Sequence, residues 1–168
     1  MKWIYGRQDW KTLERGLENC YLLTNGLGGF SSLTMTGAVA RNDHSVFMAC
    51  TKAPNHRINM IHRMKEELDI GESKYVLSTQ EFADGTKEEG YRYLTEFSFE
   101  ILPSWRYLIN GIEIEKEIVM AQGSNQIAVN YHLKNRGQKE AALCVTPFFQ
   151  FEPKGEDLKE DKIFSRQE

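Results

Sequence analysis

Residues 105–120 read WRYLINGIEIEKEIVM, and they carry the clearest signal of fold class in the chain. Asn110 and Gly111 tolerate the positive φ angles that a two-residue type I′ turn requires, so the stretch predicts a tight β-hairpin. Beyond the turn, apolar and acidic side chains alternate with the period of two that is typical of a half-buried strand. The apolar positions are Ile112, Ile114, Ile118 and Met120, and the acidic positions are Glu113, Glu115 and Glu117.

Further strands are predicted on both sides of this hairpin. Residues 91–102 and 127–133 alternate in the same way, and a turn at Asn135–Gly137 leads into another strand. Residues 45–51, SVFMACT, are apolar on both faces, which indicates a central strand. Residues 58–70, INMIHRMKEELDI, fit a helix or a strand, but GESK and YVLST after them read as a hairpin partner and favour the strand.

One short helix is expected before the strands. Residues 9–18, DWKTLERGLE, place Trp10, Leu13 and Leu17 on one helical face, with Asp9 as the N-cap. Together with about nine or ten strands, this pattern predicts an all-β antiparallel sandwich with one N-terminal helix. We expect the sandwich domain over residues 1–151 and a charged linker, tail or sheet connection over residues 152–168.

Composition excludes several classes of function. The chain has 168 residues, of which 40% are hydrophobic and 27% charged, which suits one soluble globular domain. A net charge of −3 provides no basic field for nucleic acid, and no apolar run is long enough to span a membrane. Cys20, Cys50 and Cys144 are odd in number and far apart, so we expect buried, reduced thiols in a cytoplasmic protein.

Three glycines stand close together in residues 21–30, YLLTNGLGGF. Such a loop can bind a phosphate or can let the backbone turn sharply. A dinucleotide loop needs G-x-G-x-x-G between a strand and a helix, but a strand-like run, SSLTMTG, follows here, and the P-loop lysine is missing. We therefore interpret Gly26, Gly28 and Gly29 as a backbone corner, with a positive φ at one of them or more.

The glycine stretch and its surroundings resemble a known family. LLTNGLGGFSSLTMTGAVAR at residues 22–41, followed by HSVFMA, resembles the N-terminal domain of the bacterial and archaeal glycogen debranching enzymes, the amylo-α-1,6-glucosidases. The matching positions are Thr24, Asn25, Gly26, Gly28, Gly29, Phe30, Ser32, Thr34, Gly37, Arg41 and His44. The departures are Cys20, Asn42, Asp43 and Ser45. With YVLST, GYRYLTEFSFEILPSWRY and IEIEKEIVM, the resemblance covers residues 13–151.

This resemblance implies a β-supersandwich of the galactose-mutarotase type, placed before an α/α-toroid that carries the catalytic carboxylates. It implies that Asn25 and the three glycines form a structural motif. It also implies that the sandwich is incomplete at its C-terminal end in this chain, since family members continue it. The implied partners are the catalytic toroid of the same parent chain and an α-glucan such as glycogen.

The chain itself is expected to hold no catalytic residues, cofactor or metal. A glycosidase needs two carboxylates in a cleft, but the strand acids fall on outward faces, so the chain alone is expected to be inactive. The histidines lack the spacing of metal ligands; they are His44, His56, His62 and His132.

Lys116 and Trp105 are candidates for a domain contact or a sugar contact. Alternation places Lys116 on the apolar face, where its head could reach solvent, pair internally with Glu66 or Glu96, or contact a ligand. The strand spacing of Trp105 and its aromatic neighbours favours core packing, whereas an exposed ring would stack on a sugar.

Arg41 and His44 are the other two candidates for such a contact. They belong to residues 41–45, RNDHS, which join two expected strands at one end of the sandwich. Five polar residues there predict either a solvated turn or a docking surface. On a docking surface, Arg41 would donate to a carboxylate or carbonyl of the catalytic domain, or locally to Asp43.

Two functions follow from these observations. In the first, the chain is the non-catalytic N-terminal domain of a glycogen-debranching α-1,6-glucosidase, a glycoside hydrolase of glycogen breakdown, and packs on the catalytic toroid while aiding α-glucan binding. In the second, it is a stand-alone carbohydrate-binding or protein-interaction sandwich.

Overall fold

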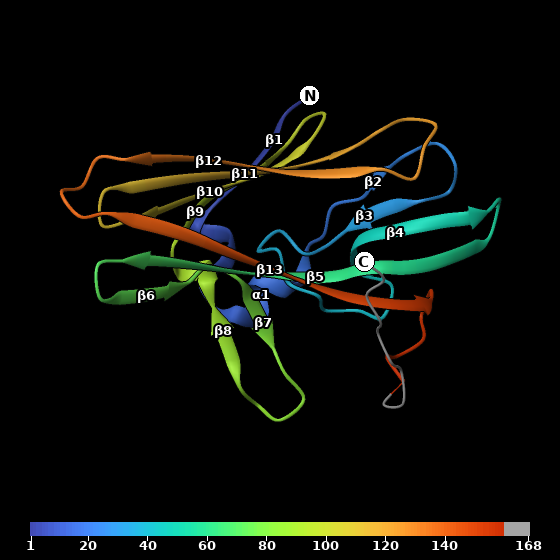
Figure 1. Cartoon of the computed structure of the whole chain (residues 1–168), viewed down its shortest axis with the longest axis horizontal. Helices are drawn as coiled ribbons and strands as arrows, with labels where there is room; N and C mark the ends of the chain where they lie inside the picture. Colours follow the sequence, from blue (N-terminus) through green and yellow to red (C-terminus); the bar gives the residue numbers. More distant parts are fainter. Residues whose placement is uncertain (160–168) are drawn as a thin grey trace, which may run out of the picture.

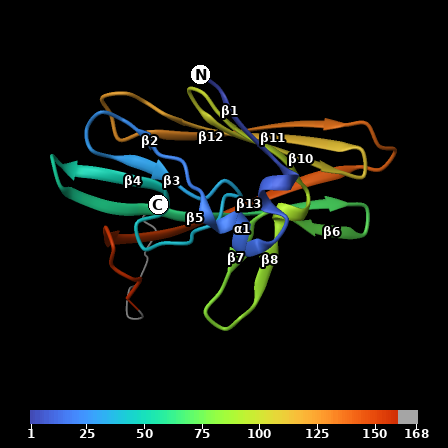
Figure 2. The ribbon, with the colours of Figure 1, turned by 180° about the vertical axis from the view of Figure 1, so that it is seen from behind.

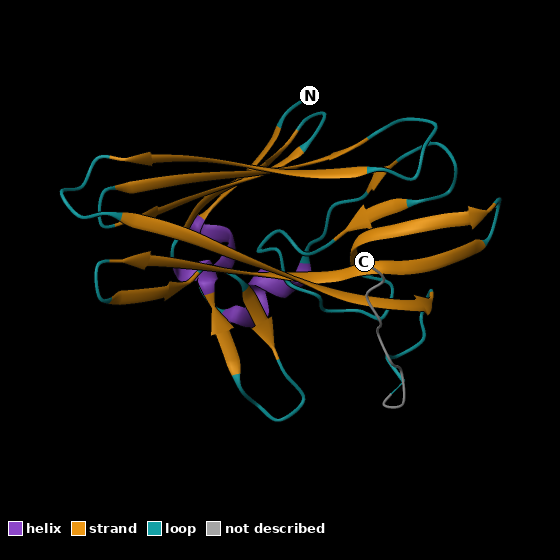
Figure 3. Cartoon of the chain, in the orientation of Figure 1, coloured by secondary structure: helices purple, strands orange, loops and turns teal. Residues whose placement is uncertain are grey.

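The computed structural model describes residues 1–159, which form two antiparallel β-sheets packed face to face. Figure 1 shows the two layers one above the other, and Figure 3 shows how little of the chain is helical. The predicted all-β antiparallel sandwich is confirmed. None of the described helices is long and apolar enough to cross a membrane.

The upper layer in Figure 1 is a five-stranded sheet in the order β1-β9-β10-β11-β12. Its strands are β1 (Trp3–Gly6), β9 (Leu94–Phe99), β10 (Pro103–Ile109), β11 (Ile112–Met120) and β12 (Ile127–Asn135). The lower layer is a six-stranded sheet in the order β13-β5-β4-β3-β2, with β6 also paired to β5. Its strands are β2 (Leu23–Thr24), β3 (Phe30–Ser32), β4 (Ser45–Lys52), β5 (His56–Ile70), β6 (Ser73–Val76) and β13 (Ala141–Pro153).

The remaining elements are a two-stranded hairpin and three short helical turns. The hairpin of β7 (Thr79–Glu81) and β8 (Lys87–Glu89) projects away from the six-stranded sheet (Figure 1). The helical turns are η1 (Arg7–Trp10), α1 (Leu13–Glu18) and η2 (Gly90–Arg92). Seen from behind, in Figure 2, they lie in front of β13.

The hairpin of β10 and β11 forms as predicted. Asn110 has φ 48° and Gly111 has φ 82°, the two positive angles that the short turn needs. Every second residue of β11 from Ile112 to Met120 is buried, and the acidic residues between them are half-buried on the other face. The prediction for residues 58–70 is also confirmed, because β5 is one strand that pairs with both β4 and β6.

The core lies between the two sheets. Phe97 and Trp105 from the five-stranded sheet meet Leu68 and Val46 from the six-stranded sheet, and all four are at most 2% exposed. Burial of such side chains contributes about 1.5–3 kcal/mol each relative to exposure. β4 is central, between β3 and β5, and its first six residues are buried, as its apolar sequence predicts.

The predicted helix over residues 9–18 is wrong in its boundaries. The segment divides into η1 and α1, and the N-cap is Thr12, whose hydroxyl accepts the Arg15 N–H. Asp9 instead accepts the Gly6 N–H at 2.8 Å, at the start of the 3₁₀ turn. Trp10 and Leu13 are buried as expected.

Two predicted strands are shorter than the alternation suggested. Residues 90–92 form η2 and β9 begins only at Leu94, while Ile101 is 78% exposed beyond its end. In SSLTMTG, β3 ends at Ser32 because Thr34 turns the chain. Its N–H donates to the Ala38 carbonyl, and its hydroxyl accepts the Ala38 N–H.

The prediction that all three thiols are buried is wrong for two of them. Cys50 is buried on β4, but Cys20 and Cys144 are exposed. Cys144 lies on the outward face of β13, an edge strand. β13 runs to Pro153, and residues 160–168 of the predicted tail lie outside the described residues, so the division at residue 151 stays a prediction.

Candidate functional site

The glycine corner, residues 25–29, connects β2 and β3. Asn25 is fully buried, and its Oδ1 accepts the N–H groups of Leu27 and Gly29, both at 3.0 Å. Gly26 has φ 77° and Gly28 has φ 95°, which confirms the prediction of positive φ angles. Because Asn25 occupies two of the amides, the corner is organised around its own side chain.

The glycine corner also joins the two sheets at this end of the sandwich. The Asn25 amide donates to the Ser124 carbonyl at 2.9 Å, in the connection between β11 and β12. Asn125 in the same connection bonds the Cys50 N–H and carbonyl at the end of β4. Asn25 thus holds the glycine corner against the β11–β12 connection, and Asn125 holds that connection against β4.

A cleft of about 490 Å³ lies beside the glycine corner. It is lined by Cys20, Tyr21, Leu22, Thr24, Gly28, Gly29, Phe30, Ser32, Arg41, Asp43, Arg57 and Lys154. The cleft brings together residues that were predicted for different reasons. Gly28 and Gly29 were predicted as part of a structural motif, and Arg41 was predicted as a docking residue. Arg57 and Lys154, which sequence reasoning missed, come from β5 and from the segment after β13.

The cleft carries more positive than negative charge. Arg57 is held in place because its Nε donates to the Gly28 carbonyl at 2.6 Å, and Lys154 Nζ lies over the Phe30 ring at 5.9 Å. Arg41 Nε lies 3.4 Å from Asp43 Oδ1, and the two side chains are 57% and 45% exposed. Three cations against one carboxylate suit a carboxylate or carbonyl group on an opposing surface.

His44 lies beneath the Arg41 loop and does not face the cleft. It is 1% exposed, and its Nδ1 accepts the Ala40 N–H at 3.1 Å. Within residues 1–159 its Nε2 has no hydrogen-bond partner. Burial, and next the Arg41 guanidinium, lower the pKa of His44, so the ring is held neutral. Through its bond to the Ala40 N–H, the buried His44 ring holds the start of the Arg41 loop in place.

Lys116 forms an internal ion pair between the sheets. Its Nζ on β11 lies 2.5 Å from Glu66 Oε1 on β5, and both side chains are 5% exposed. The Tyr131 hydroxyl of β12 donates to the same oxygen at 2.8 Å, and Lys116 Nζ lies 5.2 Å from the Trp105 ring centre. Of the alternatives for Lys116, the pairing with Glu66 is the one that forms, whereas Glu96 pairs with Arg106.

Trp105 belongs to the core and not to a surface. Its side chain is 0% exposed, and its indole N–H donates to the Met35 carbonyl at 2.9 Å. The structure therefore leaves no face of Trp105 open to a sugar. Trp105 is buried because β10 alternates strictly, which places Trp105 and Tyr107 inward together. Of the four candidate side chains for a domain or sugar contact, only Arg41 lines the cleft.

A second hollow, which we call the aromatic groove, lies on the outer face of the six-stranded sheet. It has a volume of about 410 Å³ and includes Phe82, Phe148, Arg63 and Glu88 in its lining. The Arg63 guanidinium carbon lies 5.1 Å from the Phe82 ring centre and 4.9 Å from that of Phe148. Phe82 and Phe148 are 38% and 44% exposed.

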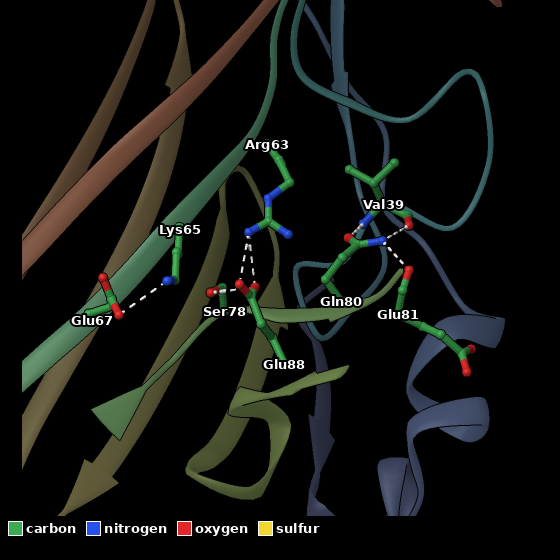
Figure 4. A network of polar contacts seen from close by, with 8 residues as sticks. All are labelled: Val39, Arg63, Lys65, Glu67, Ser78, Gln80, Glu81 and Glu88. Carbon is green, nitrogen blue, oxygen red and sulfur yellow. Dashed lines mark hydrogen bonds and ion pairs between the residues drawn. The ribbon is translucent and has the colours of Figure 1, made fainter. Parts of the chain in front are cut away.

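Arg63 and Glu88, which line the aromatic groove, belong to the network of polar contacts drawn in Figure 4. Arg63 donates to both carboxylate oxygens of Glu88, at 2.9 and 3.1 Å, and the Ser78 hydroxyl donates to Glu88 as well. Gln80 on β7 bonds the N–H and the carbonyl of Val39, just before the Arg41 loop. The β7–β8 hairpin is thereby fastened to both β5 and this loop.

Sequence reasoning missed the aromatic groove because its parts are far apart in the chain. Arg63 is on β5, Phe82 follows β7 and Phe148 is on β13. The available signal was the run TPFFQF at residues 146–151, where apolar residues stop alternating. In the structure the register of β13 shifts there.

Two of the outward strand acids share one arginine as their partner. Glu96 and Glu115 both pair with Arg106 on the outer face of the five-stranded sheet. Among residues 1–159, no three His, Cys, Asp or Glu side chains lie close enough together to hold a metal ion. The cleft and the aromatic groove offer groups for hydrogen bonding and stacking.

Comparison with known proteins gives one match that covers most of the chain. The family model described as "Glycogen debranching enzyme N terminal" matches residues 19–168. A membrane protein insertase, YidC of Thiobacillus denitrificans, is 32% identical over 60 residues, which are 36% of this chain and 11% of the insertase. The match thus spans about a tenth of that relative. No solved structure matches the chain.

Proposed function

The chain belongs to the family of glycogen debranching enzyme N-terminal domains, and from this membership we propose that it is a non-catalytic sandwich that docks on an α/α-toroid catalytic domain of an α-1,6-glucosidase. The docking surface is the cleft beside the glycine corner. The cytoplasmic location inferred from the sequence belongs to the same proposal.

The observation that carries this proposal is the exposed Arg41 beside a rigid corner. Arg41 extends from a loop that His44 orders from below and that Gln80 fastens from the side. Its only ion pair among residues 1–159 is with Asp43, at 3.4 Å and largely in solvent, where such a pair contributes little to stability. The guanidinium can therefore exchange Asp43 for a carboxylate of the catalytic domain at small cost.

Amide hydrogen exchange tests the docking surface. The 168-residue chain is compared alone and in a polypeptide that joins it to a debranching catalytic domain. We expect slower exchange in the joined protein at residues 20–32 and 41–43, and no change at residues 82–86 in the tip of the β7–β8 hairpin. Equal exchange at residues 20–32 and 41–43 in both proteins would contradict docking at this cleft.

A second function, carbohydrate binding, is favoured by the aromatic groove. Two half-exposed rings, Phe82 and Phe148, stand beside the polar side chains of His62, Gln150 and Asp157. Ring faces with adjacent hydrogen-bonding groups suit the C–H face and hydroxyls of a pyranose, and an α-glucan is the ligand that family membership suggests. Because Arg63 is already paired with Glu88, the groove suits a neutral ligand.

Electrophoresis through a gel that contains glycogen tests this second function. We expect glycogen to retard the chain, and we expect Phe148→Ala and Phe82→Ala to remove most of the retardation. Trp3→Ala is the matched control, since Trp3 is 55% exposed on β1 of the other sheet. Mobility that does not depend on glycogen, or equal retardation of all variants, would contradict it.

A further inference from the structure

Asparagine is followed by glycine at two places in the chain, Asn25–Gly26 and Asn110–Gly111. This dipeptide can modify itself, because the glycine nitrogen can attack the side-chain amide carbon of the asparagine. The amide group leaves with the glycine proton as ammonia, and a cyclic succinimide remains. Water then opens the ring at one of its two carbonyls and gives aspartate or isoaspartate. Glycine favours the attack because it has no side chain in the way and its backbone rotates freely.

The side chain of Asn25 is held on all sides. It is fully buried, and its Oδ1 accepts two N–H groups of the glycine corner, both at 3.0 Å. Its Nδ2 donates to the Ser124 carbonyl at 2.9 Å and to Asn125 Oδ1 at 3.2 Å. All of these bonds must break, and the corner must open, before the amide carbon can meet the Gly26 nitrogen. The fold therefore protects Asn25.

Asn110 is held by much less. It is exposed at the tip of the hairpin of β10 and β11, in the turn that it forms with Gly111. Within residues 1–159 its side chain makes one hydrogen bond, from Nδ2 to the Tyr75 hydroxyl on β6 at 2.8 Å. Water can replace an exposed bond of this kind, so its net contribution is small. The tip of a hairpin also opens locally at far lower cost than a buried corner, and an open tip lets the glycine nitrogen approach.

We propose that Asn110 deamidates spontaneously in the folded chain, at a rate that the Tyr75 hydroxyl limits, and that Asn25 does not. The Gly111 nitrogen is the nucleophile, ammonia is the leaving group, and water is the only co-reactant. The net change replaces the amide NH₂ by a hydroxyl group, and the resulting carboxyl group is ionised at neutral pH. The reaction is independent of docking at the cleft, because neither Asn110 nor Tyr75 lines it.

The two products differ in what they do to the hairpin. Aspartate at position 110 keeps the backbone unchanged, and Asp-Gly suits the same turn. Its carboxylate can accept a hydrogen bond from the Tyr75 hydroxyl, and Lys139, which lines the same hollow of about 250 Å³, supplies an opposite charge. Isoaspartate adds one carbon atom to the main chain, so the turn no longer matches the pairing of Ile109 with Ile112. The first product is therefore tolerated, whereas the second loosens the tip.

Peptide mapping by mass spectrometry, after incubation of the folded 168-residue chain at mildly alkaline pH, tests the proposal. Trypsin releases the two sites in separate peptides, residues 16–41 and residues 107–116. We expect a mass gain of about one dalton, with isoaspartate, to accumulate at residue 110 at least about tenfold faster than at residue 25. In the chain unfolded by urea the two sites should react at similar rates, because the dipeptide is the same. No reaction at residue 110, equal rates in the folded chain, or a difference that persists in urea would each overturn the proposal.

A second variant tests the part played by Tyr75. Tyr75→Phe keeps the ring but removes the acceptor of the Asn110 amide, so we expect the reaction at residue 110 to become roughly threefold faster or more. Tyr93→Phe is the matched control, since the Tyr93 ring packs edge-on against Tyr75 at 5.8 Å while its hydroxyl does not bond Asn110. It should leave the rate unchanged. Equal rates in the two variants would overturn the role given to the Tyr75 hydroxyl.

Discussion

Two ion pairs in this domain each join a basic side chain to a carboxylate, but one pair is buried and the other is exposed. Lys116 and Glu66 meet between the sheets, where each side chain is 5% exposed. Arg41 and Asp43 meet on the rim of the cleft, 57% and 45% exposed. Charges attract strongly in the interior but have lost their hydration there, whereas water and salt screen the surface pair. We infer that the first pair is part of the fold and that the second leaves Arg41 available to a partner.

The largest expected effect comes from breaking the buried pair. Glu66→Gln removes the charge that compensates Lys116, so we expect the free energy of unfolding to fall by about 3–5 kcal/mol. The matched surface change, Asp43→Asn, should alter it by less than about 0.5 kcal/mol. Urea denaturation of the two variants measures both values, and similar losses in the two would remove the distinction between the pairs.

Removing both buried charges should restore much of this loss. Replacing a buried ion pair by apolar residues of similar volume is often neutral or stabilising by about 1–4 kcal/mol. We therefore expect Lys116→Met with Glu66→Leu to be more stable than either single variant, although the Tyr131 hydroxyl then lacks its acceptor. Additive losses in the double variant would show that each side chain acts through packing and not through charge.

A substitution in the glycine corner, beside the cleft, should cause a smaller loss of stability. Gly28→Ala should destabilise the chain by about 1 kcal/mol or more, because its φ is 95° and an added Cβ would lie 3.1 Å from the Pro54 carbonyl oxygen. Gly85 has a similar φ of 85° but open space around it. Gly85→Ala therefore measures the backbone strain alone, and an equal loss at both sites would show that the contact at Gly28 has no cost.

The free energy of unfolding should also depend on pH, because His44 is buried beneath the Arg41 loop; this effect should be smaller than those above. Burial lowers the pKa of His44, so the folded state binds fewer protons than the unfolded state once the pH falls below the ordinary histidine pKa of about 6.5. Stability is then present above that pH and is lost as the pH falls. Burial lowers the pKa of His62 as well, which adds to the same trend.

Urea midpoints measured between about pH 7.5 and 5.5 test this dependence. His44→Asn should flatten the curve, because the asparagine Oδ1 can still accept the Ala40 N–H but does not titrate. His132→Asn, at an exposed position on β12, should leave the curve unchanged. A curve that His44→Asn does not flatten would show that His44 is not its source.

Local patterns predicted the parts of the fold that depend on neighbours in sequence. Asn110–Gly111 and the alternation after it specify a hairpin without help from elsewhere, and the same alternation placed Lys116 and Glu66 on facing surfaces. The helix start was wrong because Asp9 and Thr12 are both good caps, and the contact between Asp9 and Gly6 decided between them.

The sites were harder to predict because they are assembled from distant segments. The cleft joins Gly28 to Lys154 and the aromatic groove joins Arg63 to Phe148, and no short motif links these positions. Tyr131 was expected only as a strand residue, since its bond to Glu66 depends on how the two sheets are stacked. His44 was expected to face outward, but the turn at residues 41–44 directs its ring into the interior.

The most direct measurement of the central claim is the change in melting temperature caused by Arg41→Glu, with and without an attached catalytic domain. In the 168-residue chain alone we expect almost no change, because Arg41 is exposed and its pair with Asp43 is screened. In the joined protein we expect a clear drop and a slower debranching rate, because the reversed charge repels the carboxylate that Arg41 would contact. The same small change in both proteins would contradict the account, since Arg41 would then belong to a solvated turn.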